Sequence, residues 1–465
     1  MVSSKWLPPS NDPLITRVND CLTRVFHQQP QSSYHLLVAY SGGLDSSVLL
    51  HLLAVLQQQL RVSSGAPFQL ELSAMHVHHG LSMHADTWAQ HCQQVCQQYA
   101  IPLQVRRVNV AKASGQGIEA SAREARYNAL QQTAADFICL AHHQQDQAET
   151  LLLQLMRGAG PKGLAGMPEL DLVQGLIRPL LDVSRQALET YANTHALSWV
   201  EDDSNQNTHY DRNFMRHKVL PLLATRYSGV HKTLSRAAQH MAEASELLTE
   251  LAEMDASQVV AAGLPMNQVC LQTTQLATLT EARAKNLLRW WIAQHGLRMP
   301  NAEILKQILQ QLVSARKEAL IDIQLSDSYS VKRYLGLAYI VKDIVPVMLD
   351  ELVWHGEPVL PLNAQDSRVC EWYVGQGIAQ KYFASSPLRI RLRAGGERFK
   401  PEIGRPSRTL KYIFQAHTIP PWLRERMPLV WLGDSLVCIP NIGIDPSVAA
   451  RPDEMGLLIR WQTNP

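Results

Sequence analysis

The most informative stretch of the sequence is Leu36-Leu37-Val38-Ala39-Tyr40-Ser41-Gly42-Gly43-Leu44-Asp45-Ser46-Ser47-Val48-Leu49-Leu50. Its apolar first half is typical of a buried parallel strand, and after a Ser-Gly-Gly turn the pattern becomes helical. Two adjacent glycines allow a tight turn whose N–H groups can approach a ligand, because no Cβ atom obstructs them. The following helix directs its unpaired N–H groups and the positive end of its dipole at the same turn. The stretch therefore predicts an anion site, with phosphate as the expected anion.

The residues from Ser41 to Ser46 resemble the PP-loop, Ser-Gly-Gly-x-Asp-Ser, of the ATP pyrophosphatase family. Every fixed position matches, and the segment lies between a strand and a helix as the motif requires. The stretch lacks both the Walker pattern and the spaced glycines of a dinucleotide-binding fingerprint. The resemblance implies that ATP is split between its α and β phosphates, leaving AMP on a substrate oxygen. A plain Gly-Gly turn before a helix N-cap is the alternative interpretation.

Composition favours a cytoplasmic protein of two or three domains. The chain has 465 residues and seven scattered cysteines, an odd number without a repeating framework, as expected for a reduced cytosolic protein. Cys92 and Cys96 share one helical face, and we interpret them as small apolar residues rather than as metal ligands or a redox pair. No apolar run is long enough to cross a bilayer, and the N-terminal residues lack the apolar region of a signal peptide.

A formal net charge of only +2 means that any nucleic-acid footprint must be local. Between residues 389 and 426, ten basic residues face only Glu397, Glu402 and Glu425. This density predicts a surface for a phosphate backbone, with a solvated basic face as the alternative. The basic residues are Arg389, Arg391, Arg393, Arg398, Lys400, Arg405, Arg408, Lys411, Arg424 and Arg426.

Strand and helix patterns alternate through the first part of the chain, which predicts an α/β fold with a doubly wound parallel sheet. After the strand before the Ser-Gly-Gly turn we expect strands near 70–78, 103–110 and 136–141, and helices over 44–60, 84–99, 117–135 and 145–157. Ligands of such sheets bind at the carboxyl ends of the strands. The predicted domains are a catalytic domain (1–221), a mostly helical domain (222–345), a connector (346–386) and a small basic α+β domain (387–465).

The segment His142-His143-Gln144-Gln145-Asp146-Gln147-Ala148-Glu149-Thr150 crosses a strand end and the next helix. Asp146 and Glu149 share one face of the first turn, where they could hold Mg²⁺. Alternatively, they only favour the helix dipole. Zinc is not expected at the His-His pair, because no cysteine or third histidine stands at ligand spacing. We interpret His142 as a hydrogen-bond donor to phosphate or substrate.

Two further groups have both a functional and a structural interpretation. Arg123 and Arg126 could clamp phosphates bidentately, with Tyr127 one helical turn from Arg123; they could equally form a solvated charge network with Glu119. His76, with His78 and His79, ends the second strand. The resemblance to ATP pyrophosphatases implies that these histidines shape the nucleotide pocket, and a polar strand end is the alternative.

Taken together, these segments resemble the tRNA(Ile)-lysidine synthetase family along nearly the whole chain. The C-terminal segments distinguish this family from other PP-loop enzymes. The matching segments are 41–46, 76–81, 119–127, 142–150 with Arg157-Gly158, Arg178-Pro179-Leu180-Leu181, Asp202-Asp203-Ser204-Asn205, Arg212-Asn213 with Arg216, 283–297, Val331-Lys332-Arg333-Tyr334, 393–399, 409–411 and 420–429.

The resemblance implies an ATP-dependent ligase. ATP would adenylate the carbon-2 oxygen of the wobble cytidine in a CAU-anticodon tRNA(Ile), and the ε-amine of free L-lysine would then attack carbon 2 and expel AMP. It also implies residue roles. ATP would be bound by Ser41, Gly42, Gly43, Leu44, Asp45, Ser46 and His76. Mg²⁺ would be bound by Asp45 and Asp146, and catalysis would involve Asp45, Arg123, His142, Asp146 and Glu149. The tRNA would contact Arg212, Asn213, Arg216, Arg398, Lys400, Arg405, Arg408 and Lys411.

One position departs from the family pattern. The family commonly has His-His-x-Asp-Asp-Gln, whereas this chain has Gln145 in place of the first acid. Gln145 can accept a hydrogen bond but carries no charge. The rival predictions are a PP-loop tRNA thiolase, which usually carries Cys-x-x-Cys pairs that are missing here, and a catalytically inactive tRNA-binding accessory protein. The sequence leaves the choice between monomer and homodimer open.

Overall fold

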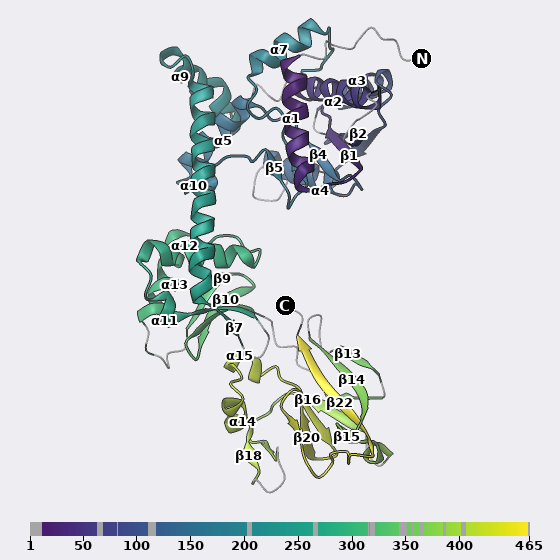
Figure 1. Ribbon diagram of the computed structural model, residues 1–465, viewed down its shortest axis with the longest axis vertical. Helices are drawn as coiled ribbons and strands as arrows, with labels where there is room; N and C mark the ends of the chain where they lie inside the picture. The colour runs from purple at the N-terminus through teal and green to yellow at the C-terminus, as the bar shows by residue number, and fades with distance from the viewer. Residues whose placement is uncertain are drawn as a thin grey trace. The chain divides into compact units, whose positions relative to one another are not determined.

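The structure is a computed structural model that describes residues 12–62, 68–80, 82–109, 118–201, 207–263, 268–314, 316, 321–343, 351–355, 357–361, 366–384, 387–400 and 406–463. The chain divides into two compact units, Met1–Leu247 and Leu248–Pro465. The boundary falls inside the long helix α10 (Val230–Val259), so one continuous helix belongs to both units (Figure 1). Within the described ranges, the model contains no helix with both the length and the apolar character needed to span a membrane.

The first unit is built on a six-stranded sheet in the order β3-β2-β1-β4-β6-β5. The pairs β2–β3, β1–β2, β1–β4 and β4–β6 are parallel, and only β5 runs antiparallel to its neighbour. This order confirms the predicted parallel α/β fold. The strands in chain order are β1 (Ser33–Ala39), β2 (Gln69–His78), β3 (Leu103–Arg107), β4 (Phe137–Cys139), β5 (Leu170–Asp171) and β6 (Leu176–Ile177).

Helices pack on both faces of this sheet. The PP-loop helix α2 is buried on every face from Ser46 to Leu56, because it is enclosed by the sheet and by neighbouring helices. Helix α1 was not predicted, although Ile15, Val18, Leu22 and Val25 repeat at helical spacing and are buried. The helices are α1 (Pro13–Gln28), α2 (Leu44–Val62), α3 (Ala85–Gln98), α4 (Ile118–Gln131), α5 (Gln144–Met156), α6 (Pro161–Leu164) and α7 (Arg185–Thr194).

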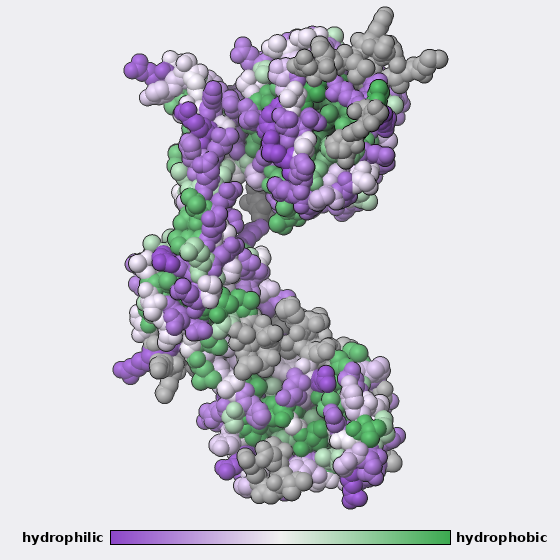
Figure 2. All heavy atoms as spheres, in the orientation of Figure 1, coloured by the Kyte–Doolittle hydropathy of each residue, from purple (hydrophilic) through white to green (hydrophobic). Residues whose placement is uncertain are grey.

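A short helical segment precedes α10. It consists of α8 (Asp211–Phe214), a π-helical stretch η3 (Met215–Val219) and α9 (Leu220–Arg226). The segment packs on α5 through Leu220, which is buried against Ala148 and Leu152. Figure 2 shows mostly hydrophilic side chains along α10, on which Leu247 and Met254 are the largest exposed apolar groups.

The middle region was predicted to be mostly helical, and its described residues contain helices together with one antiparallel sheet. Helices α11 (Thr273–Leu276), α12 (Glu281–Gln294) and α13 (Ala302–Ser314) share a core with a five-stranded antiparallel sheet in the order β7-β8-β11-β10-β9. Two of its strands are short and lie between helices, so their alternation was too brief to recognise. The strands are β7 (Val260–Gly263), β8 (Gln268–Gln272), β9 (Asp322–Ser326), β10 (Tyr329–Tyr334) and β11 (Leu337–Lys342).

The described residues of the range 346–386, which was predicted to be a connector, supply strands to the C-terminal sheets. Strand β14 (Asp366–Val374) pairs along its whole length with β22 (Met455–Thr463), and β12 (Leu352–Val353) pairs with β16 (Leu388–Arg391). The remaining elements are β13 (Val359–Pro361), β15 (Ile378–Ala379), the 3₁₀ turn η4 (Gln380–Ala384), β17 (Arg398–Phe399), β18 (Arg408–Thr409), α14 (Leu410–Ala416), α15 (Pro421–Arg424), β19 (Leu429–Leu432), β20 (Ser435–Ile439) and β21 (Gly443–Ile444).

Candidate active site

The PP-loop joins β1 to α2 at the carboxyl edge of the parallel sheet. Gly42 has a φ of +84°, and a Cβ atom there would lie 3.0 Å from Cys92 Sγ and 3.1 Å from Val200 Cγ2. Glycine is therefore required at this position both by the backbone conformation and by its neighbours. The Val200 N–H donates to the Gly42 carbonyl at 2.9 Å, which fixes a later segment of the chain against the loop.

The two serines of the loop hold its turn closed. Ser41 Oγ and Ser46 Oγ lie 3.0 Å apart, and Ser46 Oγ donates to the Gly43 carbonyl at 3.0 Å. The Gly43 N–H points toward Ser41 Oγ at 3.4 Å. The structure thus brings together the residues from Ser41 to Ser46 that were predicted to bind ATP, at the start of a helix whose dipole favours an anion.

His76 supports the loop from β2. It is buried, and its Nδ1 atom lies 3.1 Å from the Tyr40 carbonyl oxygen and 3.4 Å from Cys92 Sγ. Burial lowers the pKa of His76 below its ordinary value, so the imidazole is neutral at pH 7. Burial also raises the pKa of the Cys92 and Cys96 thiols to about 12, which agrees with their interpretation as small apolar residues.

Asp45 has one oxygen that is held and one that is available. Its Oδ2 atom lies 3.3 Å from Arg185 Nη1 and 3.6 Å from His143 Nε2. Its Oδ1 atom is buried and has no hydrogen-bond partner within the described residues. An unpaired buried carboxylate oxygen is costly, so this atom is suited to a cation that is supplied with the substrate.

His143 links Asp45 to Asp146. Its Nε2 atom is 3.6 Å from Asp45 Oδ2 and 3.6 Å from Asp146 Oδ2. The Gln145 N–H donates to its Nδ1 atom at 3.1 Å, while Asp146 Oδ2 accepts from the His143 N–H at 3.0 Å, forming a capping box at the start of α5. Although burial opposes it, Asp146 and Asp45 raise the pKa of His143. Because Nδ1 accepts a hydrogen bond, the ring proton is on Nε2, facing both carboxylates.

Asp146 and Glu149 are paired with two arginines. Arg212 donates to Glu149 Oε2 and to Asp146 Oδ1, both at 2.9 Å. Arg216 donates to Glu149 Oε1 at 2.6 Å, to Glu149 Oε2 at 2.9 Å and to Asp146 Oδ1 at 3.1 Å. Glu149 is fully buried, so this network compensates the carboxylate charges inside the protein.

This network shows what four of the predicted site residues contact. Every carboxylate oxygen of Asp146 and Glu149 already has a partner, so neither is placed as an open Mg²⁺ ligand. Within the described ranges, no group of three or more His, Cys, Asp or Glu residues could hold a metal ion. The predicted tRNA contacts of Arg212 and Arg216 stay predictions, whereas the structure adds that both guanidinium groups pair with Asp146 and Glu149. Pattern reasoning missed this because each residue lies more than sixty positions from its partner.

Electrostatics keep Asp146 ionised. Burial alone would raise the pKa of Asp146, but His143, Arg212, His142 and Arg216 together lower it well below its ordinary value. His142 shows the opposite balance, because burial lowers its pKa well below 6.5 and three arginines lower it further. Asp146 is therefore a weak base, and His142 is a neutral imidazole at pH 7.

Arg123, Arg126 and Tyr127 lie on α4, as predicted. Arg123 is exposed, donates to the Tyr127 hydroxyl at 3.3 Å and lies 5.1 Å from the centre of that ring. Arg126 is more enclosed, and its Nε atom is buried without a partner among the described residues. Asn213 donates to the Asn207 carbonyl at 2.9 Å. The segment Asp202-Asp203-Ser204-Asn205 and the side chain of Glu119 lie outside the described residues.

The predicted basic surface is brought together on one hairpin and the helix after it. Arg398 on β17 pairs with Thr409 and Arg408 on β18 pairs with Phe399, while Lys411 begins α14. The Arg408 guanidinium lies 4.9 Å from the centre of the exposed Tyr412 ring. Lys400 is exposed, and Arg405 lies outside the described residues. Arg389 and Arg391 instead pair with Glu351 at 2.6 Å and 2.7 Å.

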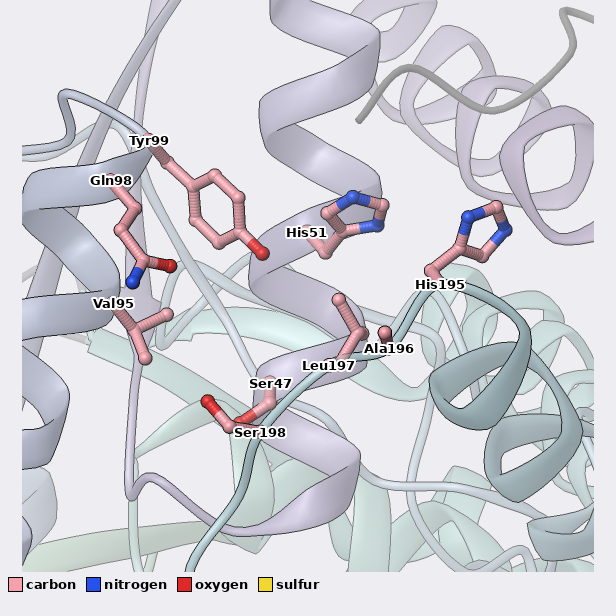
Figure 3. Close-up of a pocket in the computed structure, with 9 residues that line it drawn as sticks. All are labelled: Ser47, His51, Val95, Gln98, Tyr99, His195, Ala196, Leu197 and Ser198. Atoms are coloured by element: carbon pink, nitrogen blue, oxygen red, sulfur yellow. The ribbon is translucent and has the colours of Figure 1, made fainter. Parts of the chain in front are cut away.

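A cavity of about 320 Å³ lies beside the start of α2, and its lining residue Ser47 directly follows the predicted ATP-binding residue Ser46. Figure 3 shows His51 projecting from α2 toward His195, with Tyr99 on the opposite wall. His51 Nδ1 lies 2.9 Å from the Tyr191 hydroxyl, so a histidine-tyrosine cluster forms this wall. The cavity is lined by Ser47, His51, Val95, Gln98, Tyr99, His195, Ala196, Leu197 and Ser198.

Three residues of the site had no assigned role in the sequence analysis. Arg185 contacts Asp45, Arg178 follows β6 and is buried, and His231 on α10 has a pKa that burial lowers although Glu149 opposes the shift. A signal existed for Arg178 only, because it lies at a strand end of a parallel sheet. Arg185 is the first residue of α7 and His231 lies in the first turn of α10. Neither residue belongs to a sequence motif that indicates a function.

Comparison with known proteins agrees with this geometry. Residues 15–223 match the model of the PP-loop domain, so the first unit is the nucleotide-using domain of a PP-loop enzyme. Residues 271–339 match the TilS substrate binding domain and residues 388–461 the TilS substrate C-terminal domain.

Full-length relatives then define the family. The chain is 40% identical to the tRNA(Ile)-lysidine synthase of Nitrosomonas europaea, covering 99% of this chain and 98% of that one. It is 37% identical to that of Coxiella burnetii (93% and 94% covered) and 36% identical to that of Escherichia coli O157:H7 (95% and 100% covered). The chain belongs to the tRNA(Ile)-lysidine synthase family, a family of ATP-dependent ligases.

Proposed function

We propose that this chain joins free L-lysine to carbon 2 of the wobble cytidine in a CAU-anticodon tRNA(Ile), through an adenylated cytidine. The observation that carries the proposal is the closed Ser-Gly-Gly turn at the start of α2, with a free oxygen of Asp45 beside it. In the first step the cytidine O2 atom attacks the α-phosphorus of ATP and pyrophosphate leaves. In the second, the neutral lysine amine attacks carbon 2, AMP leaves with the oxygen, and the amine loses a proton.

The PP-loop residues would bind and orient the phosphates. The amides of Gly42 and Gly43 and the hydroxyls of Ser41 and Ser46 surround one turn, where preorganised donors stabilise a departing anion without reorganisation. Leu44 begins the helix behind them and is buried. The neutral His76, whose Nδ1 atom lies within hydrogen-bond distance of the Tyr40 carbonyl oxygen, would keep this turn in place beside the nucleotide.

The residues present fit Mg²⁺ at Asp45. Magnesium in nucleotide enzymes is commonly held by one or two carboxylates together with substrate phosphates and water, and Asp45 Oδ1 is the buried carboxylate oxygen without a partner in the described site. When bound, the ion would neutralise pyrophosphate charge. Asp146, which was also predicted as a ligand, is instead proposed to hold His143, Arg212 and Arg216 in place.

Two sets of residues would position the tRNA. Arg398, Lys400, Arg408 and Lys411, with Arg405 outside the described residues, provide a basic surface for the phosphate backbone. We propose that Arg123 contacts the wobble base or its phosphate, and that the neutral His142 donates a hydrogen bond to a substrate.

The test is lysine incorporation by the full chain. Purified protein, ATP, Mg²⁺, radiolabelled lysine and a CAU-anticodon tRNA(Ile) transcript should give labelled tRNA and AMP in equal amounts. Asp45→Asn should abolish AMP formation and leave tRNA binding nearly unchanged, whereas Asp434→Asn on an exposed turn should behave as the parent. Failure of the unsubstituted protein to label tRNA would refute the proposal.

The same assay distinguishes the rival functions. A thiolase would need reactive sulfur, but all seven cysteines are buried and none of them forms a disulfide. Sulfur incorporation without lysine incorporation would support it nonetheless. Tight tRNA binding without AMP formation would indicate an inactive accessory protein.

A further inference from the structure

Two arginines and one neutral histidine beside Asp146 have buried nitrogen atoms without hydrogen-bond partners in the described part of the chain. Arg178 is only 5% exposed, and its Nη1 atom donates to the Pro168 carbonyl at 2.7 Å while its Nε atom has no partner. The Nε atom of Arg126 and the Nδ1 atom of His142 are buried and unpartnered as well. Unsatisfied buried polar atoms are rare in native proteins, and a bound ion or ligand is one explanation for a cluster of them.

The fold brings these three residues to one edge. Arg178 directly follows β6 and His142 follows β4, and these two strands are parallel neighbours. Arg126 lies on α4, the helix that follows β3 in the chain. Both Arg126 and Arg178 interact electrostatically with His142. Burial lowers the pKa of both arginines, and this effect outweighs the opposing effects of Tyr127 on both, of Asp146 on Arg126 and of Asp171 on Arg178.

Nearby carboxylates do not balance this charge. Asp146 and Glu149 are already neutralised by Arg212 and Arg216. Asp171 faces Arg178 from β5 at longer range, and its Oδ1 atom accepts from the Gln174 N–H. Among the described residues, Arg126 and Arg178 form no ion pair within 4.0 Å. The group therefore retains an excess of positive charge in an enclosed place, which an anion would compensate.

We propose that Arg126, Arg178 and His142 bind the α-carboxylate of the free lysine substrate, an assignment that rests on the proposed ligase function. The phosphates of ATP belong at the end of β1, and β4 separates β1 from β6 in the sheet. With its carboxylate bound by Arg178 at the end of β6, lysine would extend its flexible four-carbon side chain across the end of β4 toward Asp45 and the PP-loop. Bidentate arginine contacts suit a planar carboxylate.

The experiment compares lysine with amines that lack the carboxylate. The full chain with ATP and tRNA is assayed with lysine, with lysine amide and with 1,5-diaminopentane, and lysine binding is measured directly by calorimetry. The unsubstituted protein should favour lysine over 1,5-diaminopentane by about 100-fold in kcat/KM, since charged hydrogen bonds are lost. Arg178→Gln and Arg126→Gln should each remove most of this preference. Each should lower kcat/KM for lysine and leave kcat/KM for 1,5-diaminopentane within about twofold of the parent value.

Controls separate binding from folding and from the proposed function. Arg178→Lys should restore part of the preference, and Arg61→Gln at the far end of α2 should change nothing. Arg126→Gln, on the less buried α4, tests the assignment if Arg178→Gln does not fold. Equal losses for lysine and 1,5-diaminopentane would overturn the carboxylate assignment, and so would a raised KM for ATP or tRNA alone, which would indicate a phosphate. Calorimetric lysine binding without any tRNA labelling would overturn the proposed function and leave this site intact.

Discussion

At the scale of single residues, the site depends on which carboxylate oxygens are already occupied. Asp45, Asp146 and Glu149 are alike in the sequence, yet only Asp45 keeps a buried oxygen without a partner among the described residues. Glu149 accepts three hydrogen bonds from Arg212 and Arg216. Gln145 contributes its backbone N–H to His143, so the departure from the family pattern leaves the capping box complete.

Replacing Glu149 by glutamine should destabilise the protein rather than alter its Mg²⁺ dependence. The substitution leaves Arg212 and Arg216 with an uncompensated charge in a buried network, which costs about 3 kcal/mol. Denaturant unfolding of the variant measures the loss, and the Mg²⁺ concentration at half-maximal activity should stay near that of the parent. Glu189→Gln, which removes an exposed partner of Arg185, should cost less than about 0.5 kcal/mol. A shifted Mg²⁺ requirement with unchanged stability would return Glu149 to the metal site.

At the scale of elements, helix α5 is the centre of the site. Its N-cap residue is His143, its first turns supply Asp146 and Glu149, and its capping box fixes the chain directly after His142. The segment with α8 and η3 is held to α5 by the two arginines and by the apolar contact of Leu220. Helix α5, predicted from the sequence as a short helix with acids near its start, thus connects the chain at His142, the PP-loop residue Asp45 and the segment of α8 and η3.

The capping box predicts how stability depends on pH. The pKa of Asp146 is lowered in the folded protein, so the unfolded chain takes up the proton first as the pH falls. The stabilisation is complete above the ordinary carboxyl pKa of 3.8 and is lost at lower pH. Unfolding free energies of the parent and of Asp146→Asn, measured from pH 7 downward, should therefore differ by a constant amount and converge below about pH 4. A difference that grows in acid would contradict the assignment.

The hairpin of β17 and β18 with α14 predicts a salt effect on tRNA binding. Arg408→Gln with Lys411→Gln should raise the tRNA KM and reduce the slope of log affinity against log salt by about two, one for each lost phosphate contact. Lys381→Gln is the matched control, because Lys381 binds Glu454 at 2.9 Å and lies on a different element. An unchanged slope in the double variant would mean that this surface is only solvated.

At the scale of the whole molecule, two compact units share one helix. The residues proposed to act in catalysis belong to the first unit, and both regions that match substrate domains belong to the second. Helix α10 crosses the boundary without a break. We therefore expect chemistry with ATP and recognition of tRNA to be separable by changes within this helix.

A proline in the middle of α10 should separate them. Leu247→Pro removes a backbone hydrogen bond and kinks the helix, costing about 3 kcal/mol locally, and should lower kcat/KM for tRNA by about 100-fold through misplacement of the substrate. Equilibrium binding of ATP should be unaffected. Leu247→Ala is the control, since this side chain is 65% exposed and alanine keeps the helix. Equal turnover by both variants would show that α10 does not couple the units.

The sequence by itself determined the features that depend on near neighbours. The strand, the Ser-Gly-Gly turn and helix α2 follow from periodicity and from glycine's freedom at φ +84°, and the parallel sheet follows from the alternation of strands and helices. The basic hairpin was visible as a local excess of charge.

Only the tertiary structure decided which distant charges meet. Arg212 and Arg216 occupy carboxylates more than sixty positions away, and Arg185 lies 140 positions from Asp45. Similarly, β14 finds its partner β22 across a gap of ninety residues or so. Periodicity reports only the face on which a side chain lies, whereas ion pairing and strand pairing depend on chain crossings that no local pattern encodes. The same limit applies to Arg126, Arg178 and His142, whose unpartnered nitrogens became visible only when the fold brought them to one edge.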